Sequence, residues 1–252
     1  GQLVGPRGIC HDYTGAGQGD AGAAQETLNV KGAYKTSFEL KKVDRRSPTE
    51  GQAPPEGAVV LLPYEPGKAP DLSAWTNANW KAYDDGSMGV QPGSGPNTTK
   101  DKIGDCQLHL EFYLPLMAGA FGQGRSNSGV YVQNRYEIQL LDSFGVLPQT
   151  AGDCGGLYDI STPLVNASLP PERWQTYDIE FRAARLNEDG SQKEPARLTV
   201  RHNGIVIQEN VALAGPTPGG TAGPGAPEDI LHLQDHGNQV RFRNIWYVPL
   251  ND

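Results

Sequence analysis

The sequence has no long apolar run and no excess of basic residues. None of its apolar stretches approaches the roughly 18 residues that a membrane-spanning helix needs, so we expect no membrane span. The net charge is −8 at pH 7, and no basic stripe interrupts the acidic balance. Nucleic acids and anionic membrane surfaces bind basic patches, so neither is an expected partner. A neutral ligand such as a glycan suits this charge better.

Cysteines are scarce, with three among 252 residues. Cys106 and Cys154 could form one disulfide with Cys10 left over, but three reduced cysteines are an equal alternative. Metal-binding motifs are missing as well. The oxygen-rich clusters in the loops lack EF-hand spacing, and no His-Glu-x-x-His or Cys-x-x-Cys pair occurs. We therefore expect no metal and no other cofactor.

No amphipathic helix is evident, because no capping residue precedes an apolar stripe with helical spacing. Instead, 32 Gly and 20 Pro cluster between short apolar runs, as turn residues do in all-β proteins. Residues 107–114 alternate strictly between apolar and polar, and residues 174–181 and 197–202 behave similarly. Asn203-Gly204, between two such strands, suits a type I′ hairpin turn. These patterns predict an all-β fold, a jelly-roll sandwich of two sheets.

The chain is expected to contain two regions. Residues 1–57 are polar and unpatterned, which predicts an irregular N-terminal extension and connector. Strand patterns begin near residue 58, so residues 58–252 are expected to form one sandwich domain, since β domains reach this length as single units. Residues 214–228 form a long loop without core-forming residues. Such a loop is typical of a lid or binding loop, and equally of a plain insertion.

Polar residues concentrate in a first expected hairpin, residues 127–142. Glu137 and Gln139 have the same parity on its second strand, opposite to an apolar side formed by Tyr136, Ile138 and Leu140. The apolar side is expected to be buried, so Glu137 and Gln139 face either a groove or plain solvent. Asp142 has the other parity and can join them only if the strand ends near residue 141.

A second hairpin is expected at residues 233–246. His236 lies in its turn-rich centre, where a histidine is either a surface hydrogen-bonding group or a catalyst. Arg243 alternates with apolar residues and faces away from the core, where it could form a salt bridge or bind a ligand. Trp174 and Trp246 could stack on a sugar ring, but both occupy apolar strands, and we assign them to the core.

Several of these segments carry a family resemblance. They are Asn-Ser-Gly at 127–129, Tyr-Glu-x-Gln-x-x-Asp at 136–142, Trp-Gln-Thr-Tyr-Asp-Ile at 174–179, His-Asn-Gly at 202–204 and Leu-Gln-Asp-His-Gly…Phe-Arg-Asn-Ile at 233–245. Together they resemble the 3-keto-disaccharide hydrolase domain family over roughly residues 58–250. The resemblance implies a concanavalin A-like lectin/glucanase sandwich. It also implies carbohydrate breakdown, with a glycan or 3-keto sugar as partner, and leaves Ca²⁺ at a sandwich edge as an alternative to no metal.

We expect a periplasmic or secreted bacterial protein. The start at Gly1, without a signal peptide, fits a chain trimmed of that peptide and equally a cytoplasmic protein. Nothing in the sequence predicts the oligomeric state.

The motif around Glu137 bears on the reaction. An ordinary glycosidase needs two carboxylates ~5 to 9 Å apart. Retaining glucanases of the resembling fold carry Glu-x-Asp on one strand, but here Gln139 occupies the position of the central acid. A 3-keto sugar needs only one base, because its carbonyl acidifies the C2 proton, and one group that stabilises the enolate oxygen.

The resemblance and these requirements together name the candidate site residues. Glu137 is the expected base, with Asp142 and His236 as further catalytic candidates. His236, Arg125 and Arg243 are the candidates for enolate stabilisation. The residues expected to bind hydroxyl groups or other parts of the substrate are Arg125, Asn127, Tyr131, Gln139, Gln234 and Arg243. The leading hypothesis is an enzyme that cleaves 3-keto-glycosides, as a hydrolase or as a lyase and hydratase; the alternatives are a carbohydrate-binding module without catalysis and a structural accessory domain.

Overall fold

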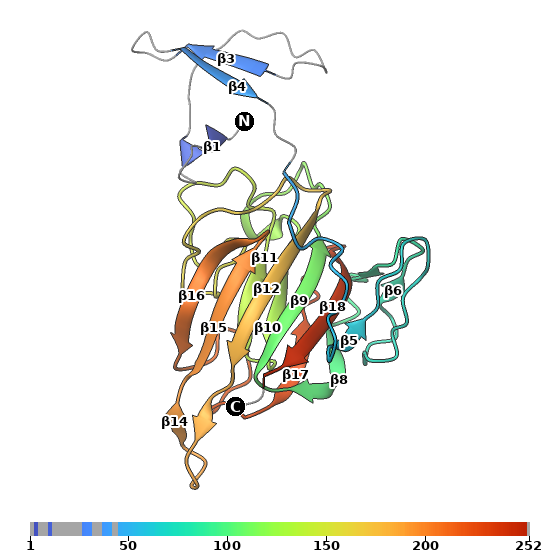
Figure 1. Cartoon of the computed structure of the whole chain (residues 1–252), viewed down its shortest axis with the longest axis vertical. Helices are drawn as coiled ribbons and strands as arrows, with labels where there is room; N and C mark the ends of the chain where they lie inside the picture. The colour runs from blue at the N-terminus through green and yellow to red at the C-terminus, as the bar shows by residue number, and fades with distance from the viewer. Residues whose placement is uncertain (1–2, 5–9, 12–26, 32–36, 42–44, 251–252) are drawn as a thin grey trace. The chain divides into compact units, whose positions relative to one another are not determined.

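The structure is a computed structural model that describes residues 3–4, 10–11, 27–31, 37–41 and 45–250 (Figure 1). Contacts divide the chain into two units, Gly1–Arg45 and Arg46–Asp252. The first unit contains two antiparallel strand pairs: β1 (Leu3–Val4) with β2 (Cys10–His11), and β3 (Thr27–Lys31) with β4 (Ser37–Lys41). The boundary expected at 57/58 falls inside the second unit and stays a prediction.

The second unit is the expected sandwich of two sheets (Figure 1). The smaller sheet has the strand order β11 (Tyr136–Leu140), β10 (Ser128–Val132), β17 (Asp229–Leu233) and β8 (Asn97–Ile103). The larger sheet has eight strands. Its order is β16 (Ile205–Leu213), β15 (Ala196–His202), β12 (Trp174–Arg182), β9 (Cys106–Tyr113), β18 (Arg241–Pro249), β7 (Met88–Gly89) and β6 (Lys81–Ala82), and β5 (Val59–Leu62) also pairs with β18.

Two short elements complete the second unit, the strand pair β13 (Arg185–Leu186) with β14 (Gln192–Glu194) and the 3₁₀ turn η1 (Gly122–Gly124). Within the described part of the chain, no helix is long and apolar enough to cross a membrane.

The core lies between the two sheets and follows the strand alternation. Leu108, Leu110 and Phe112 of β9 face it, as do Tyr136 and Ile138 of β11. Burying each such side chain contributes about 1.5 to 3 kcal/mol to the free energy of folding. The alternation expected for residues 107–114 is therefore confirmed, and it leaves the polar side chains of each sheet on the outward face.

Tight turns connect two of the antiparallel pairs. Asn203 and Gly204 both have positive φ, +52° and +79°, which confirms the expected type I′ turn. Gln133 and Asn134 join β10 to β11 with φ of +54° and +51°. This second turn holds Asn134 in a defined orientation beside the sheet.

Three findings bear on single residues of the sequence analysis. Cys106 and Cys154 are both buried and free, so they form no disulfide. Trp246 is buried, with its ring stacked on His109 at 4.9 Å between centroids. Trp174 is half-buried beneath the guanidinium group of Arg243. The assignment to the core was therefore wrong for Trp174, whereas Trp246 is among the buried hydrophobic residues, as expected.

Candidate functional site

The outward face of the four-stranded sheet carries a row of residues in register. Glu137 lies opposite Tyr131 across β11 and β10, and Tyr131 lies opposite His232 across β10 and β17. His232 in turn lies opposite Thr98 of β8. Side chains of directly opposed residues on neighbouring strands are about 5 Å apart, so this row is continuous. The site is therefore built on strands, which hold side chains rigidly.

Glu137 is buried, with 3% of its surface exposed. Tyr131 donates its hydroxyl hydrogen to Glu137 Oε2 at 2.8 Å. Burial raises the pKa of the Glu137 carboxyl group to about 7; the hydrogen bond from Tyr131 opposes this rise and the charge of exposed Asp159 adds to it. The carboxylate lies over Gly129, where a Cβ atom would collide with it. This carboxyl group can therefore gain or lose a proton near neutral pH.

His232 stacks on the same tyrosine. The two rings are 4.6 Å apart between centroids, with 15° between their planes. Nδ1 of His232 lies 2.7 Å from Asn134 Oδ1. Burial lowers the pKa of the imidazole to about 4, so His232 is neutral at neutral pH.

A second row extends the polar face toward the 3₁₀ turn η1. Gln139 donates from Nε2 to Gln123 Oε1 at 3.2 Å, and Asn127 donates from Nδ2 to the Gln123 carbonyl oxygen at 2.7 Å. Gln234 donates from Nε2 to the Tyr131 hydroxyl oxygen at 3.2 Å. Five sequence-predicted residues are thus brought together on one face: Asn127, Tyr131, Glu137, Gln139 and Gln234.

Four buried atoms on this face have no hydrogen-bond partner among the residues that the structure describes. Each of these atoms can accept a hydrogen bond, and an unpaired buried acceptor costs about 1 to 3 kcal/mol. They are Asn127 Oδ1, Gln139 Oε1, Gln234 Oε1 and His232 Nε2. A ligand rich in hydroxyl groups offers the donors that such a set requires.

Residues 214–226, here called the covering loop, lie over Glu137. Thr217 Oγ1 accepts a hydrogen bond from the Glu137 backbone N–H at 2.9 Å, and the Pro218 carbonyl oxygen lies 3.5 Å from the Tyr131 hydroxyl. Arg135 holds the loop, because its guanidinium group donates to the carbonyl oxygens of Thr221 and Gly223. Since Glu137 is almost fully buried beneath the loop, a substrate can reach it only if part of this cover moves.

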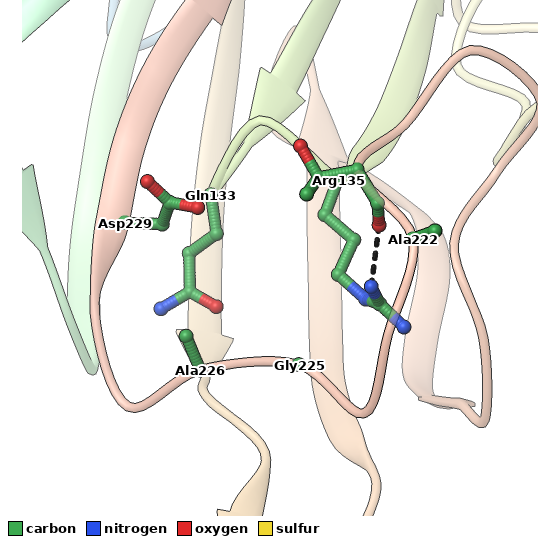
Figure 2. Close-up of a pocket in the computed structure, with 7 residues that line it drawn as sticks. Gln133, Arg135, Ala222, Gly225, Ala226 and Asp229 are labelled. Atoms are coloured by element: carbon green, nitrogen blue, oxygen red, sulfur yellow. Dashed lines mark hydrogen bonds between the residues drawn. The ribbon is translucent and has the colours of Figure 1, made fainter.

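A cavity of about 60 Å³ separates the covering loop from the turn between β10 and β11 (Figure 2). Its lining includes Gln133 and Arg135 of that turn and Ala222, Gly225 and Ala226 of the loop. Glu137 does not line it, and the volume is far below the ~300 Å³ and more of ordinary ligand pockets. The cavity thus leaves the loop free space beside the site but is not itself the site.

Two sequence-predicted residues pair with each other at the end of β11. Arg125 Nε lies 2.8 Å from Asp142 Oδ2, and the Asp142 side chain is 1% exposed. The charge of Arg125 is therefore engaged by a neighbouring carboxylate. His236 is exposed in the segment between β17 and β18, and it is not part of the row around Glu137.

The expected second hairpin does not form, because β17 belongs to the small sheet and β18 to the large one. Arg243 on β18 is consequently carried to the outward face of the large sheet, away from Glu137. Its Nε donates to Glu111 Oε2 at 2.7 Å, and its terminal nitrogen lies 3.2 Å from Glu50 Oε1. Arg243 thus forms the salt bridge that the sequence left open, with Glu111 of the neighbouring strand β9 and with Glu50 outside the sheet, and its role in substrate binding stays a prediction.

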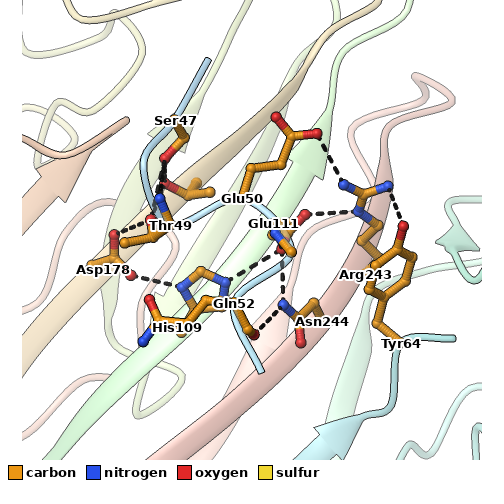
Figure 3. A network of polar contacts seen from close by, with 12 residues as sticks. Ser47, Thr49, Glu50, Gln52, Tyr64, His109, Glu111, Asp178, Arg243 and Asn244 are labelled. Atoms are coloured by element: carbon orange, nitrogen blue, oxygen red, sulfur yellow. Dashed lines mark hydrogen bonds and ion pairs between the residues drawn. The ribbon is translucent and has the colours of Figure 1, made fainter. Parts of the chain in front are cut away.

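Arg243 belongs to a second polar group, here called the strap cluster, formed by His109, Glu111, Asp178, Arg243 and Asn244 (Figure 3). Residues 46–52, the strap, cover it. The Gly51 backbone N–H donates to Glu111 Oε1 at 2.6 Å, and Thr49 Oγ1 donates to Asp178 Oδ2 at 2.8 Å. Burial opposes ionisation of Glu111, but its hydrogen bonds and the charge of Arg243 outweigh burial and lower its pKa. The ion pairs and hydrogen bonds of the cluster lie among its own residues and the strap, so we interpret the cluster as structural.

Sequence reasoning missed His232, and with it Asn134 and Thr217. The available signal was the alternation of Ile-Leu-His-Leu-Gln at 230–234, in which Leu231 and Leu233 enter the core. That parity places His232 and Gln234 outward. For metals, the described residues contain no group of three His, Cys, Asp or Glu side chains that could hold an ion.

Comparisons with known proteins agree with this architecture. Residues 57–247 match the family described as the 3-keto-alpha-glucoside-1,2-lyase-like domain. The chain is similar to a solved candidate glycosyl hydrolase from Parabacteroides distasonis, with 34% identity, a TM-score of 0.70 and coverage of 77% of this chain and 84% of that one. A second candidate glycosyl hydrolase from the same organism is 17% identical, with a TM-score of 0.54 and coverage of 78% and 95%, and shows the fold alone.

No curated protein matches the chain. The fold is the expected all-β sandwich of concanavalin A-like type. The strands of the sandwich run from Val59 to Pro249, nearly the same part of the sequence as the family match over residues 57–247. The chain therefore belongs to the carbohydrate-active family of 3-keto-alpha-glucoside-1,2-lyase-like domains.

Proposed function

We propose that this protein cleaves 3-keto-glycosides by elimination across C1 and C2, with Glu137 as the base. The observation that carries the proposal is the state of Glu137, a buried carboxyl group with a pKa of about 7 among unpaired hydrogen-bond acceptors. A general base works best when its pKa lies near the working pH. The family description supports the same reaction class.

The reaction requires little beyond this carboxylate. Glu137 removes the proton from C2, the electron pair forms a C1–C2 double bond, and the C1–O bond breaks. The leaving oxygen then takes a proton from the carboxyl group of Glu137, which regenerates the carboxylate. Gln139 Nε2 and Gln234 Nε2 each donate one hydrogen within the protein, to Gln123 and Tyr131, and the second hydrogen of each amide group can stabilise the enolate oxygen.

The arrangement disfavours ordinary glycoside hydrolysis. That reaction needs a second carboxyl group facing the scissile bond, roughly 5 to 9 Å from the first. Gln139 is an amide, and Asp142 is paired with Arg125 at the strand end. Asp159 influences the pKa of Glu137 but is exposed. Only Glu137 among these groups is buried in the row and free of a cationic partner among the described residues.

A carbohydrate-binding module is the second candidate, because the unpaired acceptors alone could bind hydroxyl groups. The two functions are separated by turnover. The protein is incubated with a 3-keto-disaccharide and with the same disaccharide unoxidised, and monosaccharide release is measured for the wild type, Glu137→Gln and Asp159→Asn.

We expect release only from the keto sugar, a fall of ~10² or more in Glu137→Gln, and retained activity in Asp159→Asn. Comparable release from the unoxidised sugar, or full activity in Glu137→Gln, would contradict the proposal. Binding of both sugars without release from either would favour the binding module.

A further inference from the structure

We propose that His232 is a second catalytic residue of this site, which takes a proton from the water that adds to C1 after the leaving group has departed. The inference rests on the proposed function, because elimination creates the C1–C2 double bond that water attacks. The enzyme would then be a net hydrolase. Its product would be the 3-keto monosaccharide, with hydroxyl at C1 and hydrogen at C2, rather than the 1,2-unsaturated sugar.

The position of His232 fits a partner of Glu137. Both residues flank Tyr131 in the same cross-strand row, one on each side. Two strand spacings of about 4.8 Å separate their backbones, roughly 10 Å in all. A pyranose ring lying over Tyr131 could present its C1–C2 edge to both side chains.

The hydrogen bonds around His232 define which ring nitrogen can accept a proton. Asn134 Nδ2 donates to Thr221 Oγ1 at 3.0 Å, so Asn134 Oδ1 faces the imidazole and accepts from Nδ1–H at 2.7 Å. In the neutral ring Nε2 is then the nitrogen with the lone pair. Since burial keeps the imidazole neutral at working pH, Nε2 is available as a proton acceptor.

Nε2 is also buried and has no partner among the described residues. The surrounding side chains thus leave this acceptor open on the face that carries Glu137. A water molecule or a sugar hydroxyl supplies the hydrogen that Nε2 lacks. The neighbouring side chains cannot replace it as the base, because Tyr131 already donates to Glu137, and Gln234 is an amide.

The added step balances in atoms and protons. Nε2 removes one proton from water, the water oxygen bonds to C1, and the electrons of the C1–C2 double bond move to the C3 carbonyl as an enolate. The imidazolium then returns its proton to C2. The net change adds hydrogen at C2 and hydroxyl at C1, and His232 ends neutral as it began.

The test supplies the unsaturated intermediate directly. The 1,2-unsaturated 3-keto sugar is given to the wild type and to His232→Gln, and its hydration is followed by loss of the enone absorbance. In parallel, aglycone release from an intact 3-keto-glycoside is measured. We expect hydration to fall by ~10² or more in His232→Gln, and by at least about tenfold more than aglycone release falls, so that the enone accumulates.

A second variant guards against a folding defect. Asn134→Gly keeps the positive-φ turn but removes the acceptor that fixes the tautomer, so hydration should again fall more than aglycone release. The inference is overturned by enone accumulation in the wild type, by equal loss of both steps in His232→Gln, or by accumulation in His236→Gln instead. A failure of the proposed function looks different: the wild type would then release no aglycone, whether or not it hydrates the enone.

Discussion

At the scale of single residues, the proposed role of Glu137 as a base carries a cost in stability. A carboxyl group with a pKa of about 7 in the folded protein and about 4.5 in the unfolded chain binds its proton more tightly when folded. Ionising it at neutral pH therefore costs stability. A pKa of about 7 in place of 4.5 corresponds to roughly 3 kcal/mol. Such a cost is typical of sites in which a buried group is kept for its reactivity.

Glu137→Gln should therefore be more stable than the wild type at pH 8. The stability of the wild type falls as pH rises from about 4.5 to about 7, since the unfolded chain releases the proton first, whereas glutamine does not titrate. We expect a difference of up to about 3 kcal/mol at pH 8 that vanishes near pH 4. Urea unfolding of both proteins at the two pH values measures it. A variant less stable than the wild type at pH 8 would contradict the assigned environment.

The pH dependence of cleavage should follow the same group. A base must be ionised, so kcat/KM of the wild type for a 3-keto-glycoside should rise with pH through about 7. The charge of Asp159 raises the pKa of Glu137, so Asp159→Asn should move this rise to lower pH. A profile that is flat from pH 5 to 9, or unmoved in Asp159→Asn, would count against Glu137 as the titrating base.

Gly129 offers a third test at this scale. A Cβ atom at this position would meet the Glu137 carboxylate, whereas at Gly119 it would meet open space. Gly129→Ala should displace the carboxylate and reduce turnover by up to ~10², because small displacements of a catalytic group are costly. Gly119→Ala is the matched control and should retain turnover. Equal activity of the two variants would show that turnover does not depend on the position of the Glu137 carboxylate above Gly129.

At the scale of elements, the covering loop bears on access to Glu137. The sequence left residues 214–228 as either a lid or a plain insertion, and composition could not decide because the loop has no pattern of its own. The structure places Thr217 and Pro218 against Glu137 and Tyr131, and Arg135 holds the outer part of the loop. These contacts favour a lid, since the carboxylate is nearly inaccessible beneath them.

A reversible crosslink tests whether the loop opens. Asn134 and Thr221 touch through their side chains, and the Thr221 backbone N–H donates to the Asn134 carbonyl oxygen at 2.9 Å. In an Asn134→Cys/Thr221→Cys variant, oxidation should lower aglycone release by more than ~10-fold, and reduction should restore it. The native Cys106 and Cys154 are buried and free, so the oxidised wild type is a suitable control. Undiminished release after complete crosslinking would show that substrate enters without this movement.

At the scale of the whole molecule, the alternation of apolar and polar residues predicted a sandwich of two sheets correctly. It did not predict which strands pair with one another. The alternation of residues 107–114 and the Asn203-Gly204 turn depend only on neighbouring residues, so both could be predicted from the sequence. Which sheet β18 joins does not depend on its local sequence. After the turn at residues 234–240 the chain can pair again within the sheet of β17 or cross to the other sheet. It crosses, and Arg243 leaves the site face for the strap cluster.

The same limit explains the remaining site residues. The parity of Glu137 and Gln139 could be read from one strand, whereas their grouping with Gln234 depends on the pairing of β10 with β17. His232 precedes residue 233, where the second hairpin was expected to begin, so it was not among the predicted site residues. Asp142 and Arg125 were expected at the site, but their mutual ion pair depends on how the chain at residues 117–126 packs beside β11.

The strap cluster should matter for stability rather than chemistry. Arg243→Met would leave Glu111, which is fully buried, without its cationic partner, and removing one member of a buried ion pair costs about 3 to 5 kcal/mol. Because the pKa of Glu111 is lowered by folding, its stabilising contribution in the wild type is lost as pH falls below about 4.5. We expect a lower melting temperature for Arg243→Met with turnover per folded molecule retained. Loss of turnover without loss of stability would return Arg243 to the substrate site.

The central claim is that Glu137 removes the C2 proton, and hydrogen exchange at C2 measures that step directly. A 3-keto-glycoside is incubated in D₂O with the wild type or with Glu137→Gln, and deuterium at C2 is followed by NMR in the recovered substrate and in the hydrated product. We predict that the wild type incorporates deuterium at C2 and that Glu137→Gln incorporates at least ~10² more slowly while still binding the sugar. Cleavage by the wild type with C2 hydrogen fully retained, or undiminished exchange in Glu137→Gln, would contradict the account.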